Sequence, residues 1–265
     1  MAKKRKILLI VIPLGLVLLC AAAAGIYYAI EREGGMINLF ASIDRTDMME
    51  ARVYTDPAGT TLPYRIYAPE SAGEVQRLPL VLYLHGAGER GGDNRAHTKK
   101  NSVMQTLLND ENLVKYPCVV LAPQCPEDGW WTDDSNIAAL AGLLEQTKAA
   151  HPIDPARVYI TGISMGGFGT WAMLALYPEQ FAAAVPICGG GEPDSAALFK
   201  DVPVWAFHGT RDKVVPPGNS RDMVQALEAA GGSVKYTEYP GERHASWEKA
   251  YREDELFPWL FAQSK

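Results

Sequence analysis

Short runs of consecutive apolar residues recur along this 265-residue chain and constrain its fold more than any other feature. Residues 80–84 read LVLYL and residues 118–121 read CVVL, so both faces of such a strand are apolar. Strands of this kind are buried on both sides and are typical of a mostly parallel sheet covered by helices. Together with the less apolar runs, they predict strands over residues 51–55, 62–67, 80–84, 118–121, 158–161, 182–187, 204–207 and 234–239.

Helical patterns lie between the later strands. Apolar residues recur at the spacing of one helix face over residues 137–144 and again over residues 223–230. A last helix is expected over residues 247–260, with an interruption at Pro258 because proline lacks the backbone N–H that a helix interior needs. Strands that alternate with helices indicate an α/β architecture with helices on both faces of the sheet.

The first two strands differ from the rest. Residues 56–59 read DPAG, a sequence typical of a tight turn, and they separate the runs at 51–55 and 62–67. We therefore expect an antiparallel hairpin at the start of the fold. The predicted fold is α/β: a mostly parallel central sheet of about eight strands, helices on both faces, and this N-terminal hairpin.

The N-terminal segment is far more apolar than the remainder. Residues 7–30 contain no charged side chain, and 24 residues in a helix span about 36 Å, enough to cross a hydrocarbon core of ~30 Å. The basic residues at 3–6 favour a cytoplasmic N-terminus. Two interpretations remain open: a signal anchor, which the length favours, or a signal peptide cleaved near residues 22–24. Both predict an extracytoplasmic protein, membrane-anchored or secreted. Lipidation of Cys20 is disfavoured because the bulky Leu19 precedes it.

These features divide the chain into a basic stub with the apolar segment at 1–30, a linker at 31–49, and one domain at 50–265. The net charge is −6, and because residues 3–6 contribute +4, the rest of the chain carries −10. An acidic body is unsuited to nonspecific nucleic-acid binding, which requires a basic face. We therefore expect no nucleic-acid partner and contact with a membrane only through the N-terminal segment. The oligomeric state stays open.

The strongest chemical motif is GISMG at residues 162–166, a G-x-S-x-G that follows one predicted strand and precedes a helix. A strand, a sharp turn and a helix form the context of a nucleophile elbow, so we expect Ser164 to be a nucleophile. The elbow holds the serine in a strained backbone conformation, and a Cβ at either flanking glycine would clash with the neighbouring strand and helix.

Two further residues lie where a nucleophile needs partners. Asp212 follows the strand at 204–207, and His244 lies on the loop after the last strand, both at the sheet edge where α/β folds bind ligands. A histidine takes the proton of the serine, and a carboxylate orients the imidazole and stabilises its cation. The remaining histidines are in less suitable places, and we assign no catalytic role to His85, His97, His151 or His208.

The glycine-rich sequence HGAG at residues 85–88 comes directly after the strand at 80–84. Backbone in such a loop can direct an N–H group at the oxyanion of a tetrahedral intermediate, and Met165, the residue after the nucleophile, supplies a second donor. The ring of His85 is expected to hold this loop by hydrogen bonds.

Three stretches carry a resemblance to a known family: LYLHGAGERG at 82–91, YITGISMGGFGTW at 159–171 and FHGTRDKVVP at 207–216. The chain resembles α/β-hydrolase esterases, including dienelactone-hydrolase-like, phospholipase/carboxylesterase-like and polysaccharide-esterase proteins. It is also similar to the catalytic domains of prolyl-oligopeptidase-type peptidases. The resemblance covers residues 51–260, implies the triad Ser164, Asp212 and His244, and places the oxyanion hole at Ala87 and Met165.

Candidate substrate contacts are Glu89 in the oxyanion loop and two adjacent aromatic residues, Trp130 and Trp131, in the loop after residues 118–121. Aromatic faces pack well against acyl groups and sugars. Core packing for the tryptophans, and an ion pair within its own loop for Glu89, remain the alternatives.

The cysteines and histidines lack paired metal-ligand spacing, so we expect no metal and no cofactor. The cysteines of the body, which we expect to be free and mostly buried thiols, are Cys118, Cys125 and Cys188.

The sequence thus predicts a serine carboxylesterase that hydrolyses short acyl esters, with acetyl and feruloyl esters as candidates, on small molecules or polysaccharides. Two alternatives stay open: a serine peptidase of the prolyl-oligopeptidase-like type, and a noncatalytic binding protein with this fold.

Overall fold

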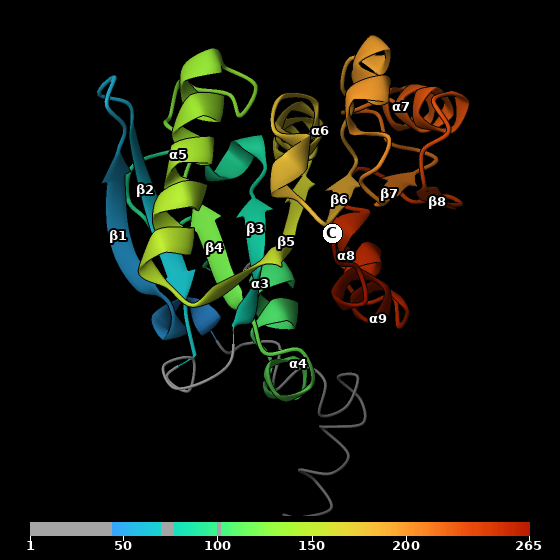
Figure 1. Ribbon diagram of the computed structural model, residues 1–265. Coiled ribbons are helices and arrows are strands. Elements are labelled where there is room, and N and C mark those ends of the chain that lie inside the picture. Colours follow the sequence, from blue (N-terminus) through green and yellow to red (C-terminus); the bar gives the residue numbers. More distant parts are fainter. Residues whose placement is uncertain (1–43, 70–76, 100–101) are drawn as a thin grey trace, which may run out of the picture. The chain divides into compact units, whose positions relative to one another are not determined.

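The computed structural model describes residues 44–69, 77–99 and 102–265, and Asp44–Lys265 form one compact unit (Figure 1). The predicted apolar segment at 7–30 and most of the predicted linker lie outside the described residues. Within the described part, no helix has both the length and the apolar character needed to cross a membrane.

A single eight-stranded sheet forms the centre of the unit, in the order β1-β2-β4-β3-β5-β6-β7-β8. β1 and β2 form the expected antiparallel hairpin, β2 is antiparallel to β4, and every other pair is parallel. The predicted fold class is confirmed. The strands are β1 (Glu50–Thr55), β2 (Thr61–Tyr67), β3 (Leu78–Leu84), β4 (Val119–Pro123), β5 (Ile153–Ile163), β6 (Ala183–Ile187), β7 (Val204–Gly209) and β8 (Val234–Tyr239).

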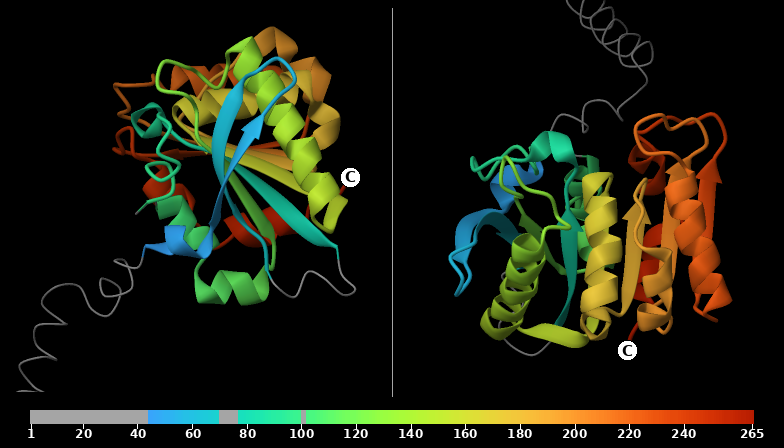
Figure 2. Two further views of the ribbon diagram at one scale, coloured as in Figure 1. Left: turned by 90° about the vertical axis from the view of Figure 1, so that its left-hand side faces the viewer. Right: turned by 90° about the horizontal axis from the view of Figure 1, so that it is seen from above.

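Helices cover both faces of the sheet, as Figure 2 shows. The longest helices, α5, α6 and α7, lie on one face, and the shorter α3, α8 and α9 lie on the other. The α-helices are α3 (Ser102–Leu107), α4 (Asp110–Lys115), α5 (Asp134–Ala150), α6 (Met165–Leu176), α7 (Gly218–Ala229), α8 (Trp247–Ala250) and α9 (Leu256–Phe261). The 3-10 helices include η1 (Arg45–Met48), η3 (Ala87–Glu89), η4 (Pro178–Gln180) and η5 (Pro193–Phe199).

The alternation of side chains along a strand explains why there are two hydrophobic cores. In β3, Leu80 and Leu82 pack into the core beneath α5, α6 and α7, whereas Val81 and Tyr83 pack into the core on the opposite face. All four side chains are fully buried. The continuous apolar run that predicted a doubly covered strand is therefore a direct consequence of these two cores.

Three local features differ from the sequence expectations. The last helical segment breaks between α8 and α9, and Pro258 lies inside α9 instead of interrupting a helix. Proline is tolerated there because the first N–H groups of a helix have no intrahelical acceptor. The strand predicted at 158–161 belongs to a longer β5 that starts at Ile153, and η1 lies within the range expected to be a linker.

Candidate active site

Ser164 occupies the turn between β5 and α6. Its backbone is in the left-handed region, with φ of +52°. Two hydrogen bonds hold this strained conformation: the Ser164 N–H donates to the carbonyl of Ile187 at 2.9 Å, and the Phe168 N–H donates to the carbonyl of Ser164 at 3.1 Å. The neighbouring strand β6 and the first turn of α6 thus fix the serine from both sides.

The two glycines of the motif permit this turn for a steric reason. A Cβ at Gly162 would come within 2.2 Å of the carbonyl oxygen of Gly166, and a Cβ at Gly166 within 1.9 Å of the carbonyl oxygen of Leu84. Both contacts involve backbone atoms, which cannot move without displacing a strand or a helix. The expected steric role of these glycines is confirmed.

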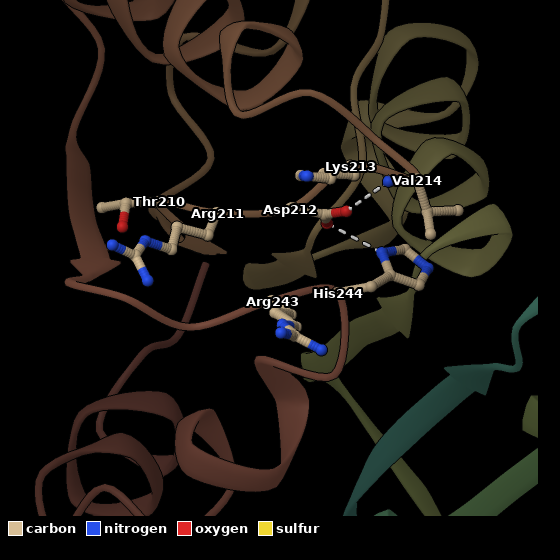
Figure 3. Close-up of a pocket in the computed structure, with 7 residues that line it drawn as sticks. All are labelled: Thr210, Arg211, Asp212, Lys213, Val214, Arg243 and His244. Atoms are coloured by element: carbon tan, nitrogen blue, oxygen red, sulfur yellow. Dashed lines mark hydrogen bonds and ion pairs between the residues drawn. The ribbon is translucent and has the colours of Figure 1, made fainter.

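His244 and Asp212 complete a hydrogen-bonded line with Ser164. The Nε2 atom of His244 is 2.9 Å from the Oγ of Ser164, and its Nδ1 atom is 2.7 Å from the Oδ2 of Asp212. Figure 3 shows the second of these contacts and the loops that carry the two residues. The three side chains predicted to form the triad therefore lie together, at the edge where β5, β7 and β8 end.

The carboxylate of Asp212 is buried and fully engaged. Its Oδ1 accepts the backbone N–H groups of Val214 at 2.8 Å and Val215 at 3.0 Å, while Oδ2 faces His244. Burial alone would raise the pKa of Asp212, but the hydrogen bonds from His244, Val215 and Val214 outweigh it and hold the pKa below its usual 3.8. Asp212 thus carries a negative charge beside the ring of His244 at neutral pH.

A second histidine contacts the same carboxylate. His208 is fully buried on β7, and its Nε2 lies 3.2 Å from the Oδ2 of Asp212 and 2.9 Å from the carbonyl of Val215. Its Nδ1 lies 2.7 Å from the Oγ of Ser220. Since both neighbours of Nε2 are acceptors, this nitrogen carries a proton and donates. The sequence analysis assigned no catalytic role to His208, and its contact with the carboxylate of Asp212 was not predicted.

Two backbone N–H groups are available for an oxyanion. Met165 is the first residue of α6, where the N–H groups have no intrahelical acceptor and the helix dipole favours negative charge. Ala87 begins η3, in the loop after β3. Within the described part of the chain, neither N–H donates to another residue. These are the two positions that the family resemblance implied.

His85 anchors the oxyanion loop, as expected. Its Nε2 accepts the backbone N–H of Cys125 at 2.9 Å, so Nδ1 carries the proton and donates to the carbonyl of Gly86 at 2.7 Å. Burial lowers the pKa of His85 to about 3, and the ring is therefore neutral. The ring connects the loop after β3 to the loop after β4.

Trp131 does not line an accessible pocket. Its side chain is fully buried, and its Nε1 donates to the carbonyl of His85 at 3.0 Å. This placement corrects the expectation that it contacts substrate: a ring that lies beneath the oxyanion loop cannot touch a ligand above it.

The other two candidate substrate contacts are at the surface of the same loops. Trp130 is 47% exposed, and the guanidinium of Arg90 lies 5.5 Å from the centre of its ring. The Oε2 of Glu89 accepts the backbone N–H of Gly86 at 2.9 Å, which supports the oxyanion loop. Trp130 remains a candidate substrate contact, whereas the principal contact of Glu89 is within its own loop.

The three cysteines of the body are buried free thiols. Cys188, which directly follows β6 and has φ of +42°, lies close to Asp212 and His244, with one potential ligand atom of each within 4.8 Å of the others. Burial raises the pKa of Cys188 to about 12, which keeps the sulfur protonated and unsuited to metal binding. The Nδ1 of His244 is also already engaged by Asp212. These residues do not fit a metal site.

Comparisons with known proteins agree with this geometry. Residues 129–255 match the Dienelactone hydrolase family. The chain is 54% identical over 194 residues to Poly(3-hydroxyalkanoate) depolymerase C of Paucimonas lemoignei, covering 58% of this chain and 45% of that protein. It is 27% identical over 168 residues to the bifunctional acetylxylan esterase/xylanase XynS20E of Neocallimastix patriciarum, covering 61% of this chain and 23% of that protein. The chain therefore spans less than half the length of these curated relatives.

Solved structures give the same fold. A thermostable esterase superimposes with a TM-score of 0.80 at 40% identity, covering 83% of this chain and 64% of that one. The feruloyl esterase module from Clostridium thermocellum superimposes with a TM-score of 0.66 at 16% identity, covering 81% and 88%, and at that identity it supports the fold alone. The chain belongs to the α/β-hydrolase superfamily, and residues 129–255, just under half of it, match the dienelactone hydrolase family.

Proposed function

We propose that this chain is a serine carboxylesterase that cleaves short acyl esters. The observation that carries the proposal is the continuous hydrogen-bonded line from Asp212 through His244 to Ser164, with contacts of 2.7 and 2.9 Å. Nucleophile and base within hydrogen-bond reach, with the base oriented by a third group, are the arrangement that acyl transfer requires.

The reaction proceeds in two steps. The Oγ of Ser164 attacks the ester carbonyl while the Nε2 of His244 takes its proton, and the backbone N–H groups of Ala87 and Met165 stabilise the oxyanion. His244 then passes the proton to the departing alcohol, which leaves an acyl-enzyme. Water attacks this acyl-enzyme while His244 takes its proton; His244 then returns the proton to the Oγ of Ser164 as the carboxylic acid is released.

Turnover of 4-nitrophenyl acetate by the full chain tests the proposal. Ser164→Ala is expected to reduce kcat by about 10⁴-fold or more, because it removes the nucleophile. Ser195→Ala provides the matched control, since Ser195 is half-buried on η5 and its side chain bonds only to a backbone carbonyl of its own turn. Equal turnover by the Ser164→Ala variant and the unmodified chain would show that the triad assignment is wrong.

The peptidase alternative uses the same chemistry and needs a separate comparison. A puromycin-hydrolysing peptidase superimposes with a TM-score of 0.60, but at 17% identity this likeness concerns the fold alone. The relatives with higher identity are a depolymerase and an esterase. We expect much faster turnover of 4-nitrophenyl acetate than of peptide 4-nitroanilides; the opposite ranking would make the chain a peptidase.

Polymer-linked esters and an extracytoplasmic location form the finer part of the proposal. A relative that acts on acetylxylan, by its name, supports acetylated xylan as one substrate to assay, with release of acetate as the readout. The apolar segment at 7–30 supports export or anchoring of the catalytic domain. Digestion by a protease added outside intact cells tests the location, and full protection of the chain would contradict it.

A further inference from the structure

A cavity of about 830 Å³ lies beside the triad and has an unusual charge for this protein. Its lining residues come from the loop after β7 and the loop after β8. Arg211, Lys213 and Arg243 all line it, and all three are exposed. The chain as a whole is acidic, with a net charge of −6. The three cations around this cavity therefore give it a charge opposite in sign to that of the whole chain.

These three cations lack partners among the described residues. None of them makes an ion pair or a side-chain hydrogen bond there, whereas many other surface arginines pair with a carboxylate. The acidic neighbours are already engaged: Glu242 pairs with Lys249 at 2.6 Å, and Asp212 is held by His244. No carboxylate that lines the cavity is left to neutralise the cations.

The position of the cavity beside His244 indicates which portion of an ester substrate can reach it, the acyl portion or the alcohol portion. Figure 3 shows the charged ends of Arg211, Lys213 and Arg243 on the side of Asp212 away from the Nε2 atom of His244. That Nε2 bonds to the Oγ of Ser164 and, in the proposed mechanism, protonates the departing alcohol. His244 therefore connects the two: its Nε2 faces the departing alcohol, and the same residue lines the cavity.

We propose that this cavity, which we call the cationic subsite (Arg211, Lys213 and Arg243), binds a carboxylate carried by the alcohol portion of the ester. The inference rests on the proposed esterase function and adds a substrate class to it: esters whose alcohol is a hydroxy acid. Guanidinium groups match the planar geometry of a carboxylate, and cations that line a cavity with low-dielectric walls concentrate anionic ligands.

Oligoesters of hydroxy acids fit this description. When the last ester bond of such an oligomer is cleaved, the alcohol portion is a hydroxy acid that carries the terminal carboxylate. The named substrate of one relative, a poly(3-hydroxyalkanoate), is a polymer of this chemical type. Neutral acetylated sugars would leave the cationic subsite empty.

A length series of simple esters tests the inference with the full chain. The probes are ω-acetoxyalkanoates with alcohol portions of about four to eight carbons, each paired with its neutral primary amide, and the readout is acetate release. At low ionic strength, we expect the carboxylate to exceed its amide in kcat/KM by about tenfold at one or more lengths, equal to about 1.4 kcal/mol. Added salt is expected to reduce this ratio, because exposed charges are screened.

Variants then assign the effect to the named residues. In Arg211→Gln/Arg243→Gln, the ratio is expected to fall to within about twofold of one. Lys200→Gln is the matched control, because Lys200 is an exposed cation at the end of η5 that lines no part of the cavity, and this variant is expected to keep the full ratio.

The outcomes separate this inference from the proposed function. A ratio near one at every length, or a high ratio that persists in the double variant, overturns the cationic subsite. If the amides are still hydrolysed in a manner that depends on Ser164, the esterase proposal stands alone. If no probe and no 4-nitrophenyl acetate is hydrolysed above the Ser164→Ala background, the esterase function fails and the inference fails with it.

Discussion

Asp212→Asn is a sensitive test of the site, because it changes one atom and leaves the shape of the side chain intact. The carboxylate now faces four donors: the backbone N–H groups of Val214 and Val215 at Oδ1, and at Oδ2 the ring of His244 together with that of His208 at 3.2 Å. An amide has a single accepting oxygen. With that oxygen at Oδ1 two bonds survive, whereas the reverse orientation sets the amide NH₂ against two backbone donors. The amide nitrogen must therefore face His244.

The substitution is expected to change the tautomer of His244. Opposite an NH₂ donor, the Nδ1 atom accepts, so the proton of the ring moves to Nε2, where it points at the Oγ of Ser164. In this state the ring cannot take the serine proton, and no carboxylate stabilises the imidazolium. A loss of about 10⁴-fold in kcat is expected, equal to about 5 kcal/mol of transition-state stabilisation. Because substrate contacts are unchanged, KM is expected to stay within about threefold.

Steady-state turnover of 4-nitrophenyl acetate measures this effect. Asp154→Asn is the matched control: Asp154 bonds to Arg157 at 2.7 Å near the start of β5, away from the triad, and the variant is expected to keep kcat within about twofold. Because both backbone hydrogen bonds to Oδ1 survive in Asp212→Asn, its free energy of unfolding is expected to fall by about 1–2 kcal/mol. A kcat within tenfold of the unmodified chain would refute the argument from the tautomer.

Three further outcomes are expected. Gly166→Ala, whose Cβ would lie 1.9 Å from the carbonyl of Leu84, is expected to lose the native fold, whereas Gly218→Ala, which meets no atom within 4 Å, keeps its thermal unfolding midpoint. The free energy of unfolding is expected to decrease as pH falls from 6.5 towards 3, because burial lowers the pKa of His85 to about 3. Over this range the unfolded chain binds a proton at His85 and the folded chain does not, which lowers the free energy of unfolding by up to about 5 kcal/mol. A flat urea-unfolding profile between pH 7 and 4 would contradict this. A thiol reagent is expected to react with at most one cysteine of the native chain and with all four after denaturation, since the three described thiols are buried; fast reaction of two or more in the native state would refute the packing.

The triad could be predicted from the sequence because each of its members lies in the turn or loop that follows a strand. Parallel strands end at the same edge of a sheet, so residues far apart in the chain, such as Ser164 and His244, are brought together by topology alone. The strands themselves were recognisable because both of their faces are apolar. Where a strand is polar, as at the start of β5 with its sequence IDPAR, that signal is missing and the prediction began too late.

Burial of individual side chains was harder to predict. Trp130 and Trp131 are chemically identical neighbours, yet one is 47% exposed and the other is fully buried. The difference arises from the path of the loop, which brings the indole of Trp131 to the carbonyl of His85, and no local pattern encodes that contact. Contact between His208 and Asp212 was missed for a similar reason, because the loop after β7 turns back on its own strand only in three dimensions.

The hydrogen bond made by the ring of His85 determines which substitutions the loop after β4 can tolerate. It grips the loop after β4 through the backbone N–H of Cys125, a group that every residue except proline possesses. Side chains in that loop can therefore be exchanged, except for proline at position 125, while the hydrogen bond that anchors the loop carrying Ala87 is kept. The position of the Ala87 donor thus depends on a backbone group of that loop and not on its side chains, so the sequence of the loop is free to change without displacing the donor.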